Sequence, residues 1–177
     1  VGAPAHGTRL RSRGWLEHRP QRGPMTRLEL KIPPPAVALA FGIGMWLVAG
    51  LLPRMDLPLA VRVVLAIALA LIGQGISISG MVAFRKARTT INPVDPTKAS
   101  SLVARGIFRT TRNPMYVGLT LTLLGWAAYL ASPVAVVLVA FFVLYITRFQ
   151  IVPEERVLQA KFGQQYDNYR KTVRRWI

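Results

Sequence analysis

Residues 35–52 read PAVALAFGIGMWLVAGLL, a run of 18 residues without a charged side chain. An α-helix rises about 1.5 Å per residue, so this run is nearly long enough to cross the roughly 30 Å hydrocarbon core of a bilayer. We therefore predict a transmembrane helix over residues 35–52.

The next apolar run covers residues 59–84 and is interrupted by a single charge. Arg62 lies near its start, where a long basic side chain can extend to the lipid headgroups. We predict that this run also spans the membrane.

Two shorter apolar runs follow, at residues 114–130 and 134–145. They are separated by a helix breaker at residues 131–133 (Ala-Ser-Pro), and the second run needs residues 146–149 to reach full length. This pattern predicts a tight helical hairpin. Four apolar runs in one small chain would leave no polar helices to cover them in a soluble fold. The sequence therefore predicts an all-α integral membrane protein with about four transmembrane helices.

The charged residues are few and mostly basic. The 177-residue chain has 23 Lys and Arg against 7 Asp and Glu, a net charge of +16, although 52% of its residues are hydrophobic. Seven basic residues precede the first run, two lie around the first turn, seven lie between the second and third runs, and seven follow the fourth. Because positive flanking charge resists translocation, we expect both termini and the middle loop in the cytoplasm. We infer that the positive charge sets the membrane topology and contacts anionic membrane lipids, and we expect no nucleic-acid partner.

The rarest residue types exclude several kinds of chemistry. Cysteine is absent, which rules out disulfides, zinc–thiolate sites and iron–sulfur clusters. Both histidines, His6 and His18, precede the first apolar run, so we expect no histidine base and no metal site in the core.

The first 24 residues differ in composition from the rest of the chain. They are rich in Gly, Pro and Arg and lack apolar periodicity, and we interpret residues 1–24 as a disordered upstream extension with Met25 as the natural start. Residues 25–177 would then form a single domain. Arg outnumbers Lys by 18 to 5, which favours a GC-rich bacterial genome and hence a bacterial inner membrane.

The third run begins with a sequence suited to anion binding. Pro114 fits the first turn of a helix, and Asn113 is placed to cap it. The start of a helix presents free N–H groups and a positive dipole end, and Arg112 and Arg109 add fixed charge. A carboxylate or phosphate would bind well there. The alternative is a capped helix whose arginines extend to the headgroups.

Two acids lie side by side just after the fourth run. A carboxylate in the hydrocarbon costs about 3 kcal/mol, so Glu154 and Glu155 call for a cationic partner, such as a sulfonium or ammonium ligand. The alternative is that Pro153 starts a helix whose positive end favours the acids, with Arg148 or Arg156 as their ion-pair partners.

An amphipathic pattern fills the rest of the chain. Apolar and aromatic residues recur at three- and four-residue steps, while the basic residues occupy other positions. The repeating positions are Leu158, Phe162, Tyr166, Tyr169, Val173 and Trp176. We predict a C-terminal amphipathic helix on the membrane surface, broken or bent at Gly163. It would serve either as an anchor or as the roof of a pocket.

These motifs, taken in order, resemble a known family. They are Gly106-Ile107-Phe108-Arg109, Arg112-Asn113-Pro114-Met115-Tyr116-Val117-Gly118, Glu154-Glu155-Arg156-Val157-Leu158 and Phe162-Gly163-x-x-Tyr166-x-x-Tyr169. The order resembles the integral-membrane methyltransferases that include isoprenylcysteine carboxyl methyltransferase and the phospholipid N-methyltransferases. The resemblance covers residues 89–177, about half of the chain. Asn113 stands where the isoprenylcysteine enzymes have histidine. In this respect the sequence is closer to the phospholipid enzymes.

The resemblance implies an S-adenosylmethionine pocket at the cytoplasmic edge of the membrane. It implies cofactor-binding roles for Arg112, Pro114, Tyr116, Glu154 and Glu155. Our further cofactor-binding candidates are Gly106, Arg109, Asn113, Gly118 and Tyr166. Glu154 and Glu155 would hold the sulfonium or deprotonate an amine, and Arg148 or Arg156 would orient the acceptor. No metal is expected. A Gly73-Gln74-Gly75 sequence in the second run either matches a glycine motif of the phospholipid enzymes or serves helix packing.

The sequence thus favours an S-adenosylmethionine-dependent membrane methyltransferase that acts on an amphipathic or lipid-like acceptor. Carboxyl O-methylation is slightly favoured, because the region offers several arginines and no histidine base. N-methylation of an ethanolamine-type phospholipid is the alternative. A second alternative is a non-enzymatic membrane module that binds anionic lipid or a partner protein.

Overall fold

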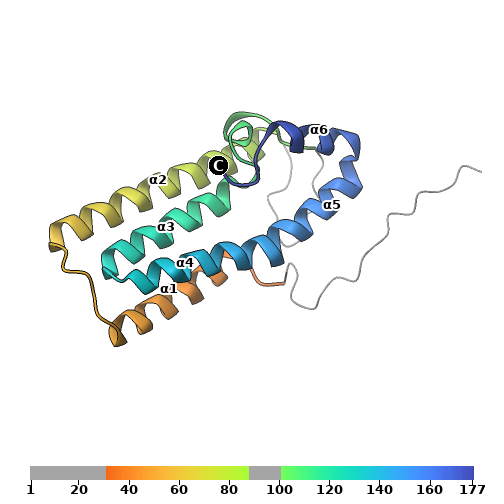
Figure 1. The fold of residues 1–177 in the computed structure, drawn as a ribbon. Coiled ribbons are helices and arrows are strands. Elements are labelled where there is room, and N and C mark those ends of the chain that lie inside the picture. The colour runs from red at the N-terminus through yellow and green to blue at the C-terminus, as the bar shows by residue number, and fades with distance from the viewer. Residues whose placement is uncertain (1–30, 88–100) are drawn as a thin grey trace, which may run out of the picture.

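The computed structural model describes residues 31–87 and 101–177, and all regular structure in these ranges is helical. The α-helices are α1 (Pro34–Leu51), α2 (Leu59–Lys86), α3 (Pro114–Leu130), α4 (Pro133–Ile146), α5 (Val152–Phe162) and α6 (Gln164–Thr172). A short 3-10 helix, η2 (Gly106–Arg109), precedes α3, and a π-helical turn, η3 (Thr147–Ile151), joins α4 to α5. Helices α1 to α4 run side by side, and α5 and α6 extend beyond one end of this bundle (Figure 1).

The predicted membrane fold is confirmed. Helices α1 and α2 and the continuous rod Pro133–Phe162 are long and apolar enough to cross a bilayer, and α3 is a shorter apolar helix of 17 residues. The first two helices lie within two residues of their predicted bounds, and α3 has the predicted bounds. The upstream extension at residues 1–24, Met25 and both histidines lie outside the described residues.

Helix α2 packs against α3 through glycines, which let the two backbones approach closely. A Cβ on Gly73 would lie 2.6 Å from the carbonyl oxygen of Gly118, and one on Gly125 would lie 2.8 Å from that of Ala66. Gly75 has open space around its Cβ position. In this bundle Gly73 therefore serves helix packing, one of the two alternatives that the sequence left open.

Aromatic side chains join the helices on the other side of the bundle. Phe41 of α1 meets Phe142 of α4 edge to face, with ring centroids 5.5 Å apart. The indole N–H of Trp126 in α3 donates to the carbonyl oxygen of Gly42 at 3.0 Å. Met45 is fully buried between these helices. Together α1, α3 and α4 enclose the main apolar core.

The predicted hairpin between α3 and α4 is present. Ala131 adopts a left-handed conformation (φ 49°) that ends α3, and the Ser132 hydroxyl accepts a hydrogen bond from the Ala135 N–H at the start of α4. The Met55 N–H of the first turn donates to the Ala131 carbonyl oxygen at 2.7 Å. The two turns therefore meet at the end of the bundle opposite to α5 and α6 (Figure 1).

The fourth apolar run continues into the acidic segment without a break. The π turn η3 adds one residue to the helical turn, and its members Gln150 and Ile151 are buried. The Gln150 side-chain N–H donates to the Ile32 carbonyl oxygen at 2.7 Å, which fastens the start of α1 to this turn. Pro153 does not start a separate helix, because the rod passes through it from α4 to α5.

The predicted amphipathic helix is divided into two. Gly163, with φ 49°, ends α5, and α6 follows with Tyr166 and Tyr169 buried and Arg170 exposed. The break at Gly163 is thus as predicted. Val173 and Trp176 differ from the prediction, because α6 ends at Thr172 and the chain is non-helical beyond it. There Trp176 packs against the main core of the bundle.

Candidate cofactor site

A cavity of about 100 Å³ lies where the start of α3 meets α5 and α6. Seven residues predicted for the cofactor line it: Arg112, Asn113, Pro114, Tyr116, Glu154, Glu155 and Tyr166. The remaining lining residues are Phe84, Ser101, Leu102, Val103, Phe108, Met115, Leu158 and Tyr169. Motifs separated by about 40 residues of apolar helix therefore meet around one space.

The two neighbouring acids have different partners. Glu154 accepts a hydrogen bond through Oε1 from the Tyr116 hydroxyl at 2.5 Å. Glu155 instead forms ion pairs with two arginines, Arg112 and Arg175. The first acid thus meets a neutral donor and the second meets two positive charges.

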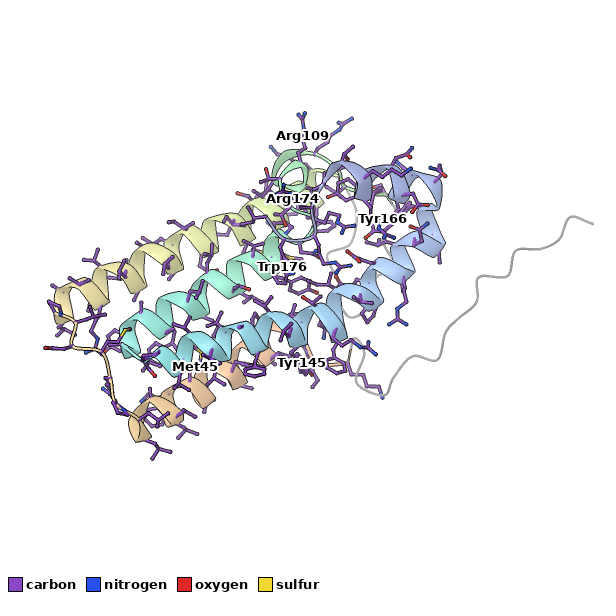
Figure 2. All side chains as sticks on the ribbon, in the orientation of Figure 1. Met45, Arg109, Tyr145, Tyr166, Arg174 and Trp176 are labelled. Carbon is purple, nitrogen blue, oxygen red and sulfur yellow. The ribbon has the colours of Figure 1, made fainter. Side chains whose placement is uncertain are left out.

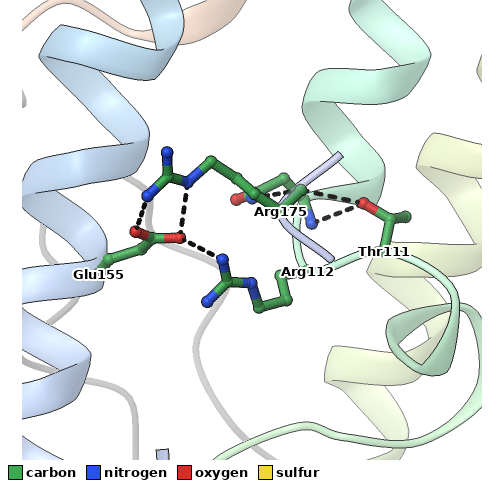
Figure 3. A network of polar contacts seen from close by, with 5 residues as sticks. Thr111, Arg112, Glu155 and Arg175 are labelled. Atoms are coloured by element: carbon green, nitrogen blue, oxygen red, sulfur yellow. Dashed lines mark hydrogen bonds and ion pairs between the residues drawn. The ribbon is translucent and has the colours of Figure 1, made fainter. Parts of the chain in front are cut away.

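The ion pairs of Glu155 form a compact network (Figure 3). Arg175 donates from Nε to Oε1 at 3.1 Å and from Nη2 to Oε2 at 2.7 Å. The Nη2 atom of Arg112 forms an ion pair with the same Oε1 at 3.1 Å. The Arg112 and Glu155 side chains are only 10% and 11% exposed, so water screens this pair weakly. The Glu155 carboxylate is therefore compensated within the protein.

Arg112 retains hydrogen-bonding capacity. Its Nε and Nη1 atoms are buried and have no hydrogen-bond partner among residues 31–87 and 101–177. A buried N–H without a partner costs about 1–3 kcal/mol, and more for a charged group. Because Arg112 lines the cavity, an anionic group bound there would satisfy these two donors.

The 173–177 segment crosses the start of α3. The backbone N–H of Arg112 donates to the Arg174 carbonyl oxygen at 3.0 Å. The Thr111 hydroxyl and the Asn113 side-chain amide both donate to the Arg175 carbonyl oxygen, at 3.3 and 2.9 Å. The prediction that the Asn113 side chain caps α3 is therefore wrong, because its amide is turned to this segment and makes no capping hydrogen bond.

Tyrosines of α6 close the site on the side away from the bundle (Figure 2, where Tyr166 is labelled). The Tyr169 hydroxyl donates to the Phe108 carbonyl oxygen of η2 at 2.7 Å. Burial raises the pKa of Tyr166 to about 12, and the charge of Glu155 adds to this effect. Burial also raises the pKa of Tyr169. Both phenols therefore remain protonated at neutral pH.

A wider groove of about 1150 Å³ adjoins the cavity. The two spaces share the wall formed by Ser101, Leu102 and Val103. Lys86 and Arg105 add positive charge to the groove, and Gly106 from the predicted site lines it as well. The cavity alone is smaller than typical ligand pockets of roughly 300 Å³ or more, so a larger ligand would need both spaces.

Other predicted residues lie away from the cavity. Gly118 lies in the α2–α3 interface against Ser77 and Gly73. Arg109 is exposed and points away from the bundle in Figure 2. Arg148 is exposed, with its guanidinium 5.5 Å from the ring centroid of Phe149, and Arg156 is also exposed.

The eight remaining lining residues were not predicted for the site, and neither was Arg175, which pairs with Glu155. Phe108 and Tyr169 are the two of these that a hydrogen bond joins across the site. The three-residue spacing of Tyr166 and Tyr169 places both on one helix face, and this signal was available in the sequence. Nothing local in the sequence connects Arg175 with Glu155. Among the described residues, no group of three or more His, Cys, Asp or Glu side chains could hold a metal ion.

The fold and this site define an integral membrane protein with a cavity at one end of its bundle, lined by apolar side chains and a few charged ones. Residues 61–165 match the family model for phospholipid methyltransferases. The match covers more than half of the chain, so the chain belongs to the phospholipid methyltransferase family and is a membrane methyltransferase. The family resemblance inferred from the motifs is thereby confirmed. Methyltransferases of this family generally use S-adenosylmethionine.

One curated relative is an uncharacterized protein of Haemophilus influenzae. It is 44% identical over 63 residues, which is 36% of this chain and the whole of that protein. No solved structure matches the chain.

Proposed function

We propose that this protein transfers a methyl group from S-adenosylmethionine to the amine of a lipid-like acceptor at the edge of the membrane. The observation that carries this proposal is the unequal pairing of the two acids. Two guanidinium groups compensate Glu155, whereas Glu154 meets the hydroxyl of Tyr116 in the cavity. Glu154 is therefore the carboxylate that is suited to a cationic ligand or to a proton.

The residues of the cavity fit the cofactor. The unpartnered Nε and Nη1 atoms of Arg112 suit the carboxylate of its amino-acid part. Glu154 and the face of Tyr166 suit a positively charged sulfur. The adjoining groove offers the volume that the cavity lacks. In this assignment the negative carboxylate of the ligand meets Arg112, and its positive sulfur meets Glu154.

When bound, S-adenosylmethionine supplies a methyl group on a positively charged sulfur, which a nucleophile displaces in line. An ammonium acceptor must first lose a proton. A Glu154 carboxylate oxygen would take that proton, and the Tyr116 hydroxyl would hold the carboxylate in place. Phe84 and Phe108 stack edge to face at 5.0 Å and help to exclude water from the cavity.

The acceptor would reach the site from the bilayer. The groove is bounded by the apolar side chains Ile78 and Val82 of α2, and Lys86 follows at the end of the same helix. Acyl chains would remain in the hydrocarbon while the headgroup entered the groove. A phosphate in that headgroup would be attracted by Lys86 and Arg105.

Carboxyl O-methylation is the second candidate. Arg112 keeps two unpartnered donors that would equally suit the carboxylate of an acceptor, and such an acceptor would need no base. Arg148 and Arg156, exposed beside the acidic pair, would then orient it. We rank this reaction second because the family match is to phospholipid methyltransferases and because Glu155 engages two of the nearby arginines.

The experiment offers purified protein both acceptor types in mixed micelles with methyl-labelled S-adenosylmethionine. An ethanolamine-type phospholipid should give a stable methylated amine, whereas a prenylcysteine-type carboxylate would give a base-labile ester. Glu154→Gln should reduce amine methylation at least 100-fold. Asp56→Asn, the same type of change at an exposed acid at the opposite end, is the matched control. Ester as the only product would reverse our ranking, and no transfer to either acceptor would favour a non-enzymatic role.

A further inference from the structure

The 173–177 segment is more than a closing turn, because it brings the Arg175 guanidinium against Glu155, which lines the cavity. We propose that Arg175 is a positioning residue: by occupying both oxygens of Glu155, it keeps two donors of Arg112 available for the carboxylate of the bound cofactor. This inference rests on the proposed function and concerns the same site. Arg175 lies beyond residues 61–165, which the family match covers.

Arg112 and Arg175 contact Glu155 in different ways. Arginine and a carboxylate prefer a pair of parallel hydrogen bonds. Arg175 makes this paired contact with Glu155, at 3.1 and 2.7 Å. Arg112 is left with a single contact, from Nη2 to Oε1 at 3.1 Å. Its Nε and Nη1 atoms therefore stay unpartnered although they are buried.

Loss of the Arg175 side chain would change how the contacts of Glu155 are shared between the two arginines. Glu155 would then have one guanidinium as its partner, and Arg112 would be free to turn and pair with both carboxylate oxygens. The donors that now face the cavity would be consumed inside the protein. The cofactor carboxylate would have to compete for them, and its binding would weaken.

The backbone of the segment is held independently of the Arg175 side chain. Carbonyl oxygens of Arg174 and Arg175 accept hydrogen bonds from Arg112 and Asn113, and Trp176 packs against the bundle core. Replacing the side chain at 175 leaves these contacts in place. The substitution Arg175→Ala therefore tests the ion pair rather than the path of the chain.

The experiment measures the binding of two ligands by calorimetry on the detergent-purified full chain. S-adenosylhomocysteine has the amino-acid carboxylate, and methylthioadenosine has the adenosine and sulfur but lacks the carboxylate. Arg175→Ala should raise the Kd of S-adenosylhomocysteine at least tenfold and that of methylthioadenosine less than twofold. Arg175→Lys, which keeps the charge but loses the paired contact, should fall between wild type and Arg175→Ala. Lys171→Ala, which removes an exposed charge of α6, should change neither constant more than twofold.

Steady-state kinetics test the same variants in a second way. The KM for S-adenosylmethionine should rise at least tenfold in Arg175→Ala, while kcat at saturation changes less than threefold. Equal losses for both ligands, or a fall in kcat with unchanged KM, would show that Arg175 only supports the fold. Unchanged binding of S-adenosylhomocysteine would overturn this inference and leave the proposed function intact. Failure of the wild-type protein to bind S-adenosylhomocysteine would refute the proposed function, and this inference with it.

Discussion

The hydroxyl of Tyr116 and the carboxylate of Glu154, 38 residues apart in the chain, are joined by a 2.5 Å hydrogen bond. Tyr116 belongs to the first turn of α3 and Glu154 to the first turn of α5. Tyr116 is only 4% exposed, so the hydrogen bond lies away from bulk water. This contact joins the two motifs that the family resemblance brought together.

Removing this phenol should slow the reaction. A hydrogen bond to a charged group contributes about 1.5–3 kcal/mol, so Tyr116→Phe should lower kcat for the amine acceptor by roughly 10- to 100-fold. Initial rates with saturating S-adenosylmethionine measure this effect. Tyr129→Phe is the matched control, because Tyr129 lies at the other end of α3, where its ring stacks on Trp126. A Tyr116→Phe variant with wild-type kcat would show that the reaction does not need the Tyr116 hydroxyl to hold Glu154 in place.

The two acids should respond differently to the same substitution. Glu154→Gln should weaken the binding of S-adenosylmethionine more than that of S-adenosylhomocysteine, because only the former carries the sulfonium charge. Glu155→Gln should weaken both ligands alike, because it acts through Arg112. It should also lower the free energy of unfolding by about 2 kcal/mol, since it leaves a nearly buried guanidinium without its counter-charge. Calorimetry with both ligands, together with thermal unfolding in detergent, tests this difference. The same ligand preference in both variants would contradict it.

Glycine substitutions should test the α2–α3 interface. A Cβ at position 118 would overlap the Ser77 hydroxyl and the Gly73 carbonyl oxygen, so Gly118→Ala should destabilise the protein by about 1–3 kcal/mol. Gly75→Ala is the control, because nothing lies within 4 Å of that position. Thermal unfolding in detergent, monitored by tryptophan fluorescence, should show a lower Tm for Gly118→Ala and an unchanged Tm for Gly75→Ala. Equal Tm values would mean that the interface is looser than the structure shows.

Much of the fold was predictable because apolar runs end abruptly in this sequence. Pro114 and the break at residues 131–133 give α3 sharp limits, and the prediction was accurate there. The end of the fourth run offers no such signal. Residues 146–153 pass gradually from apolar to polar, and Pro153 is tolerated because the π turn already alters the backbone pairing before it. The sequence therefore predicted an end to the fourth helix where the structure has a continuous rod.

The candidate site, like the fold, was predictable only in the parts that local sequence determines. Arg112 and Tyr116 lie four positions apart on either side of the start of α3, so their proximity follows from local spacing. The roles of Asn113 and Arg175 depend on the path of the 173–177 segment over α3, which links residues 62 positions apart. Such long-range contacts are fixed by packing, including that of the partly buried Trp176 against the bundle. No periodicity in the sequence encodes them.

The absence of cysteine makes the orientation of the bundle directly testable. The ends of α2 and α5, the start of α3 and the 173–177 segment gather at one end of the bundle, and the first turn lies at the other (Figure 1). Most basic residues of the described chain flank the first of these ends, and only Arg54 and Arg62 lie near the other, so we expect the first end to face the cytoplasm. In intact cells, Asp56→Cys in the first turn should react with a membrane-impermeant maleimide, whereas Lys171→Cys of α6 should react only after permeabilisation. The reverse pattern would place Arg112 and Glu154 outside the cell, away from the cytoplasmic supply of the cofactor, and would refute the proposed function.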